Sequence, residues 1–211
     1  MKIKRIGFDL DNTLYKQSIE MQEAIRATIC KKVSKRINKP YNLVKEEFER
    51  IKIETSSTSK TLKSMGIDDP KAVLWEALQE TDVSPFILKD EKLLNILNNL
   101  KKKSIILDLI TARDKISSLN VLKSLGIPVE MFEIQIFAAL KKEVTPYYNW
   151  VNISGLKTEE LAYIGDSPVG DIYPIKKTED LKNITAILVS NEKDEFADIN
   201  INKIYEIEKL F

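Results

Sequence analysis

The chain has 211 residues, 43% of them hydrophobic, with 33 basic and 32 acidic side chains and a formal net charge of +1. This length suits one well-packed domain with a smaller appendage, and the balanced charge predicts no extended surface for nucleic acid. Because no apolar run approaches the roughly 20 residues of a membrane span and no signal peptide is visible, we expect a cytoplasmic protein that does not contact membranes.

Two residue counts limit the chemistry. The chain has a single cysteine, Cys30, which excludes an intrachain disulfide and a cysteine-based zinc site. It has no histidine, which excludes a Ser-His triad and a histidine-ligated zinc ion. An enzyme of this composition is expected to use carboxylates as acid and base, with a hard, oxygen-ligated ion such as Mg²⁺.

The first part of the chain predicts one strand followed by helices. The strand covers residues 3–8, and apolar residues then recur at helical spacing. Gly66 and the pair Asp69-Pro70 mark a helix end and a helix start. The predicted helices cover residues 17–37, 43–53, 60–65 and 70–79. Residues 16–88 are therefore expected to form an all-helical region.

From residue 89 onward, helices and strands alternate. Helices are predicted over 91–100, over 115–125 and after Thr145-Pro146; strands are predicted over 104–110, 132–137, 161–164 and 184–189. This alternation is typical of α/β proteins with a doubly wound, mostly parallel, Rossmann-like sheet. We expect a core of residues 1–15 and 89–211, interrupted by the helical insertion 16–88.

The segment "FDLDNTLY" (8–15) ends the first strand with two aspartates. Residues two apart in a strand face the same side, so Asp9 and Asp11 are expected to point together beyond the strand end. That edge of an open α/β sheet is where ligands bind. Two carboxylates at this separation repel each other, which calls for a cation or a shared proton. An isolated pair of this kind can also cap a turn.

Polar residues also follow later strands. Thr111 ends the strand 104–110 and can cap the next helix or serve an anion. Lys141 and Lys142 precede the helix at Thr145-Pro146, and one of them is expected in the strand-to-helix loop. Asp166 and Asp171, in "GDSPVGD", follow the strand 161–164.

Four motifs result: the pair Asp9 and Asp11, Thr111, the lysine pair, and the pair Asp166 and Asp171. In this order they resemble the motifs of the haloacid dehalogenase (HAD) superfamily, and specifically of its aspartate-nucleophile phosphatases. The resemblance covers essentially the whole chain and is closest to the pyrimidine 5′-nucleotidase branch, which has a similar "FDLDNTLY" motif and a small helical cap after the first strand. The family's "KPxP" stands here as "KKEVTP". Both lysines therefore remain possible, and we favour Lys142 for its spacing to Tyr148.

The resemblance implies a role for each motif residue. Asp9 would be the nucleophile that forms an aspartyl-phosphate, and Asp11 the general acid and base. Mg²⁺ would be held by Asp9, the backbone carbonyl of Asp11 and Asp166. Thr111 and Lys142 would bind the phosphoryl oxygens. Asp171 would orient the lysine or a metal-bound water.

The same motifs leave other functions open. A sugar-phosphate phosphatase or a phosphomutase would share them, because the cap decides the substrate. A non-enzymatic receiver domain also surrounds a phospho-aspartate with acidic, Thr and Lys residues. Such a switch has no use for the helical insertion, which makes Asp9 to Thr111 a span of about a hundred residues where a βαβ unit needs about 30.

The predicted partner is a small phosphomonoester. The resemblance favours a nucleoside monophosphate, and the hydroxyl-rich segment "ETSSTSKTL" (54–62) is the candidate for reading it, chiefly through Thr55, Ser56 and Thr58. The alternative is that its serines cap the following helix. The oligomeric state does not follow from the sequence.

Overall fold

A computed structural model describes residues 2–55 and 57–211 of the chain. The chain forms two compact units, each described separately here. The first takes in the residues up to Gln17 together with Ile87–Phe211, and the second is Ser18–Phe86.

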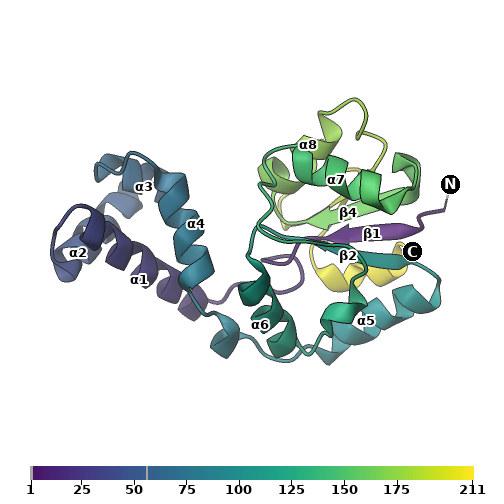
Figure 1. Cartoon of the computed structure of the whole chain (residues 1–211), viewed down its shortest axis with the longest axis horizontal. Helices are drawn as coiled ribbons and strands as arrows, with labels where there is room; N and C mark the ends of the chain where they lie inside the picture. The colour runs from purple at the N-terminus through teal and green to yellow at the C-terminus, as the bar shows by residue number, and fades with distance from the viewer. Residues whose placement is uncertain (1, 56) are drawn as a thin grey trace. The chain divides into compact units, whose positions relative to one another are not determined.

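The first unit is built on a six-stranded sheet in the order β3-β2-β1-β4-β5-β6, and every neighbouring pair is parallel (Figure 1). The strands are β1 (Arg5–Phe8), β2 (Ile106–Ile110), β3 (Gln135–Ile136), β4 (Leu161–Gly165), β5 (Thr185–Val189) and β6 (Ile199–Ile201). The predicted α/β class and doubly wound parallel sheet are confirmed.

Helices cover both faces of this sheet. Figure 1 shows α5 (Glu91–Lys102) and α6 (Lys115–Leu125) on one face, and α7 (Thr145–Ser154) with α8 (Tyr173–Lys176) on the other. β1 and β4 lie in the middle of the sheet and are buried throughout, so their residues alternate between two apolar layers. The carboxyl ends of β1, β2 and β4 consequently meet at one edge, and the candidate site is there.

The second unit contains α1 (Ile19–Arg36), α2 (Tyr41–Thr55), α3 (Thr58–Ser64) and α4 (Pro70–Glu80). The side chain of Ser18 caps α1, and the predicted cap Asp69 accepts a hydrogen bond from the Ala72 N–H at the start of α4. Gly66 adopts the predicted left-handed conformation, with φ of 79°. The core of this unit is apolar and includes Cys30, Val33, Phe48, Leu62 and Val73.

Two strands differ from the expectation. β3 has only two residues of the predicted six, because Phe132 ends a short 3₁₀ turn instead of starting the strand. β6 was not predicted, since three residues in a polar segment carry too short a pattern. The role of Ser18–Phe86 as a cap over the site stays a prediction.

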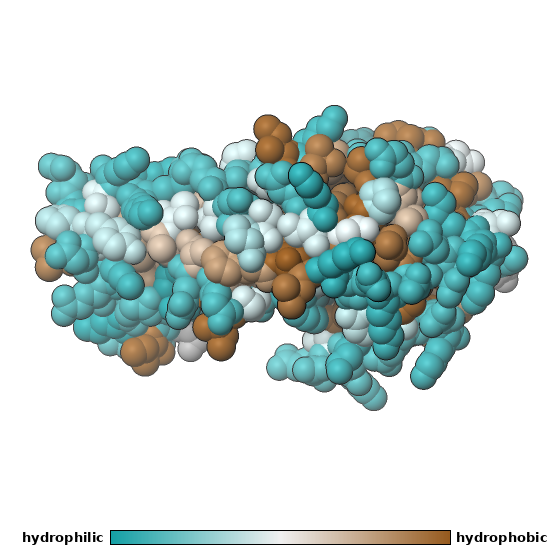
Figure 2. Space-filling view, turned by 90° about the horizontal axis from the view of Figure 1, so that it is seen from below, coloured by the Kyte–Doolittle hydropathy of each residue, from teal (hydrophilic) through white to brown (hydrophobic). Residues whose placement is uncertain are grey.

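The surface is mostly hydrophilic on the face shown in Figure 2, with hydrophobic residues in smaller groups between the charged ones. Among the described helices, none combines the length and apolar character that a membrane crossing requires.

Candidate active site

A tight turn after β1 places the first two motif residues. The Leu14 N–H donates to the Leu10 carbonyl at 3.0 Å, and Asn12 takes a positive φ of 59°, which asparagine tolerates better than most residues. The turn brings the Thr13 hydroxyl within 3.1 Å of Asp9 Oδ2, to which it donates. Asp9 is thereby fixed at the end of the strand and is 2% exposed.

Lys141, and not Lys142, lies in this site. Its Nζ is 2.5 Å from Asp9 Oδ1 and 2.8 Å from Asp171 Oδ1, whereas Lys142 is exposed to solvent. The preference for Lys142 is therefore wrong. The reason is a compact turn in which the Lys141 N–H bonds the Ala139 carbonyl at 2.9 Å, after Ala138 takes a positive φ of 52°. This turn directs the first lysine inward and the second outward.

Asp171 is completely buried and has a full set of donors. Its Oδ1 accepts from Lys141 and from the Tyr163 hydroxyl at 3.2 Å, and its Oδ2 accepts from the Ser167 N–H at 2.9 Å. Gly165 makes this packing possible: a Cβ there would lie 2.3 Å from the Asp171 carboxyl carbon. Asp171 thus connects the lysine to the loop after β4.

Three carboxylates gather around the lysine. One oxygen each of Asp9, Asp166 and Asp171 lies within 4.8 Å of the others. Burial raises the pKa of Asp9 to about 8, with Lys141 opposing the shift and the neighbouring acids adding to it. Burial and Asp171 likewise raise the pKa of Asp166 to about 6. Burial alone would lower the pKa of Lys141, but Asp9 and Asp171 raise it well above its usual range.

These shifts bear on the charge of Asp9. A free aspartate is ionised at neutral pH, but crowding and burial oppose the charge on Asp9 in the protein alone. A compensating cation would restore the ionised form. The chain supplies what a hard divalent ion prefers, because the group consists of carboxylate oxygens.

The side chain of Asp11 lies apart from this group. Both of its oxygens accept from the Nε–H of Arg113, at 2.9 and 2.8 Å, and the Tyr15 hydroxyl donates to Oδ1. Sequence reasoning missed Arg113. A basic residue three positions after a strand end reads as an exposed loop residue, yet Arg113 is only 1% exposed.

Thr111 is buried at the end of β2. Its N–H bonds the Ile136 carbonyl of β3 at 2.9 Å, and its hydroxyl oxygen accepts from the Arg113 N–H at 3.2 Å. The helix α6 begins four residues later, and Asp114 caps it by accepting from the Ser117 N–H at 3.0 Å. The threonine therefore orders the loop between β2 and α6, and its use as a phosphate ligand stays a prediction.

The hydroxyl-rich segment of the helical unit makes local contacts. Ser57 caps α3 by accepting from the Lys60 N–H, and the hydroxyls of Thr55 and Thr61 are 2.7 Å apart. The capping contact of Ser57 favours the alternative that the serines of this segment cap the following helix, and Thr55, a residue of the nucleotide prediction, contacts Thr61. Ser56, which the nucleotide prediction also included, lies outside the described residues.

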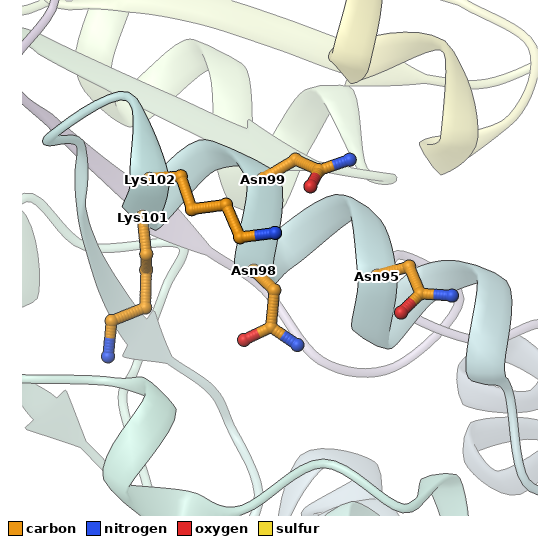
Figure 3. Close-up of a pocket in the computed structure, with 5 residues that line it drawn as sticks. All are labelled: Asn95, Asn98, Asn99, Lys101 and Lys102. Atoms are coloured by element: carbon orange, nitrogen blue, oxygen red, sulfur yellow. The ribbon is translucent and has the colours of Figure 1, made fainter.

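A surface hollow of about 790 Å³ lies elsewhere, along α5. Figure 3 shows the side chains of its five lining residues leaving the helix in different directions instead of converging on one point. They are Asn95, Asn98, Asn99, Lys101 and Lys102. Without a convergent set of polar groups, this hollow has no features of a catalytic site.

Comparisons with known proteins agree with this geometry. Residues 6–179 match the family model described as "Haloacid dehalogenase-like hydrolase". The chain belongs to this family. It is an enzyme of the HAD superfamily, as the four motifs indicated.

Individual relatives cover nearly the whole chain. A glyceraldehyde 3-phosphate phosphatase from Methanocaldococcus jannaschii is 27% identical over 220 residues, spanning 97% of this chain and 95% of its own. Two solved structures share the fold. A HAD phosphatase from Thermococcus onnurineus has a TM-score of 0.64 at 20% identity, covering 100% of this chain and 97% of the other. A putative beta-phosphoglucomutase from Thermotoga maritima has a TM-score of 0.63 at 20% identity, covering 99% and 98%.

Proposed function

We propose that this HAD enzyme is a Mg²⁺-dependent phosphomonoesterase with Asp9 as its nucleophile. The observation that carries the proposal is the group of buried Asp9, half-buried Asp166 and buried Asp171 beside Lys141, at the carboxyl ends of β1 and β4. Three acids with one lysine leave an excess of negative charge, and burial, with the neighbouring acids adding to it, raises the pKa values of Asp9 and Asp166.

Asp9 and Asp166 are the residues we expect to hold the metal ion, with the backbone carbonyl of Asp11. Asp171 belongs to the same group, but its oxygens already accept from Lys141, Tyr163 and the Ser167 N–H. We therefore assign Asp171 to positioning the lysine. A bound Mg²⁺ would neutralise charge, so that an anionic carboxylate and an anionic phosphate can approach each other.

The other side chains divide the remaining work. An Asp9 oxygen attacks phosphorus as the bond to the leaving oxygen breaks, and Asp11 gives that oxygen a proton. Asp11 then takes a proton from the water that hydrolyses the aspartyl-phosphate. Lys141, and Thr111 after displacement of its loop contact, bind the phosphoryl oxygens and stabilise the transition state.

The substrate is proposed as a small phosphorylated metabolite. The relative from M. jannaschii is named for glyceraldehyde 3-phosphate and matches almost end to end, which favours a triose phosphate. The resemblance of "FDLDNTLY" to the pyrimidine nucleotidases favours a nucleoside monophosphate instead. The local contacts of Thr55 and Ser57 remove part of the support for the second choice.

A panel of phosphomonoesters tests the proposal. We expect hydrolysis of p-nitrophenyl phosphate and of glyceraldehyde 3-phosphate, UMP or CMP in the presence of Mg²⁺, and none after treatment with EDTA. UMP or CMP should be hydrolysed faster than glucose 6-phosphate. Phosphate release from none of these compounds, or full activity in EDTA, would overturn the proposal.

A further inference from the structure

The Asp11 side chain is held by two groups that the four motifs do not explain. The guanidinium Nε–H of Arg113 is shared between both carboxylate oxygens, and the Tyr15 hydroxyl donates to Oδ1. The Arg113 side chain is 1% exposed and that of Asp11 is 22% exposed. The pair is thus buried on the arginine side and open to ligands on the aspartate side.

Arg113 comes from an ordered loop. Its N–H donates to the Thr111 hydroxyl oxygen at 3.2 Å, and its carbonyl accepts from the Ala138 N–H at 2.7 Å. Asp114, the next residue, caps α6. Because the backbone is fixed on both sides, the guanidinium has little freedom to follow Asp11 if that side chain turns away.

A role in folding alone does not account for the location of this ion pair. The same unit contains another buried pair, Arg5 with Asp108 at 3.2 Å, and there the carboxylate is completely buried. Asp11 keeps an accessible surface and stands two residues from the proposed nucleophile. The Arg113 Nε–H lies between both carboxylate oxygens, and the planar guanidinium holds this contact in one orientation better than a lysine ammonium would.

We propose that Arg113 is the positioning residue for Asp11: with the Tyr15 hydroxyl, it fixes the carboxyl group in the orientation from which its protonated form gives a proton to the leaving oxygen. This inference rests on the proposed phosphatase function. In the step concerned, the Asp9–phosphorus bond forms, the phosphorus–oxygen bond to the leaving group breaks, and the proton moves from Asp11 to the departing oxygen.

The dependence of the rate on the leaving group tests this role. An alkyl phosphate needs the proton, whereas p-nitrophenolate leaves without it, so loss of positioning should affect the alkyl substrate more. We expect Arg113→Met to lower kcat about 100-fold on an alkyl phosphate and about 10-fold on p-nitrophenyl phosphate. Arg113→Lys should recover part of the loss. Tyr15→Phe, which keeps the ring, should show the same pattern to a smaller extent.

A double-variant cycle separates positioning from direct substrate binding. In the Asp11→Asn background, Arg113→Met should add no further discrimination between the two substrates. Arg5→Met is the matched control, because it also removes a buried, ion-paired arginine; it should lower stability without changing the ratio of the two rates. Circular dichroism monitors folding, and Tyr15→Phe decides the question if Arg113→Met does not fold.

The outcomes are distinct. Equal losses on both substrates in the Arg113 variants, or in Tyr15→Phe if Arg113→Met does not fold, would overturn the inference while the phosphatase function stands. Fully additive effects of Arg113→Met and Asp11→Asn would also overturn it, because Arg113 would then act on the substrate itself. A wild-type protein inactive on both substrates would overturn the inference together with the proposed function.

Discussion

Two buried charge clusters lie on the same sheet and differ in their balance. Towards the amino end of the strands, Asp108 accepts from Arg5, from Trp150 Nε1 at 2.7 Å and from the Ile134 N–H at 2.9 Å. At the carboxyl end, Lys141 pairs with Asp9 and Asp171, and an oxygen of Asp166 lies within 4.8 Å of an oxygen of each. The first cluster gives one carboxylate three donors, whereas the second crowds three carboxylates around one cation.

The difference separates a structural role from a chemical one. Donors offset part of the cost of burying a charge, as for Asp108, whose pKa burial still raises while Trp150, the Ile134 N–H and Arg5 oppose the shift. An uncompensated group of acids costs stability, and a protein retains such a group where a ligand completes it. The comparison therefore predicts that substitutions in the amino-end cluster, Arg5 and Asp108, lower stability. Substitutions in the carboxyl-end cluster, which consists of Asp9, Asp166, Asp171 and Lys141, should lower activity.

The largest expected effect is that of Asp9→Asn. Removing the nucleophile should lower kcat by about 10⁴-fold or more, below detection in a p-nitrophenyl phosphate assay. Removing one of the crowded charges should also raise the free energy of unfolding in metal-free buffer by roughly 0.5–2 kcal/mol. Urea unfolding measures the second quantity. Retained turnover would contradict the role of Asp9, and a large loss of stability would contradict the comparison.

Asp108→Asn should show the opposite behaviour. It removes one of the two carboxylates that pair with the buried Arg5 guanidinium, while Glu133 at 2.5 Å stays, so we expect a loss of about 1.5–3 kcal/mol of unfolding free energy. The kcat of the folded variant should stay close to that of the wild type. Urea unfolding and a p-nitrophenyl phosphate assay at a temperature below the transition check both parts. A severe loss of kcat in the folded variant would show that the two clusters are coupled.

The two adjacent lysines give an internal control within the second cluster. Lys141→Met should lower kcat by roughly 10²–10³-fold, because Lys141 contacts both Asp9 and Asp171 and is expected to meet the phosphoryl oxygens. Lys142→Met should leave kcat unchanged, since that side chain is exposed. Steady-state kinetics of the two variants decide the assignment, and a loss confined to Lys142→Met would reverse it.

The smallest effect concerns pH. The raised pKa values, about 8 for Asp9 and about 6 for Asp166, mean that both residues gain protons as the pH falls from 8 to 6. Because Mg²⁺ binds ionised oxygens, its stabilising effect should weaken over this range. The shift in Tm at constant free Mg²⁺ measures it. A shift that is the same at both pH values would contradict the proposed ligands.

Metal-free protein should respond to pH with the opposite sign. The folded state binds a proton at Asp9 more tightly than the unfolded state does, since the pKa rises from 3.8 to about 8. The contribution of Asp9 to stability is therefore greatest at low pH and is lost as the pH rises through this interval. The Asp9→Asn variant should not show this loss of stability with rising pH, and its absence would assign the loss to Asp9.

Much of the fold was accessible from the sequence because its signals are local. The signals of the cap Asp69, the turn glycine Gly66 and the helix 115–125 lie within a few residues of each feature, and the structure has each of them as predicted. The strand β6 was missed because its three residues are defined by pairing with β5, not by their own pattern.

The site was accessible only in part. Asp9, Asp166 and Asp171 follow strands, so the parallel sheet itself brings them together. The choice between Lys141 and Lys142 depends on a turn with a positive φ at Ala138, an alanine that carries no sequence signal for it. Arg113 meets Asp11 across 102 positions of sequence, and no local pattern reports such a contact.

The most direct test of the central claim is the hydrolysis of p-nitrophenyl phosphate by EDTA-treated protein titrated with Mg²⁺. Wild type and Asp108→Asn are measured beside Asp9→Asn at one temperature where all three are folded. We predict no turnover before Mg²⁺ is added, similar restored rates for wild type and Asp108→Asn, and none for Asp9→Asn. Full activity without the metal, or restoration of Asp9→Asn by Mg²⁺, would contradict the assignment of the carboxyl-end cluster as the catalytic site.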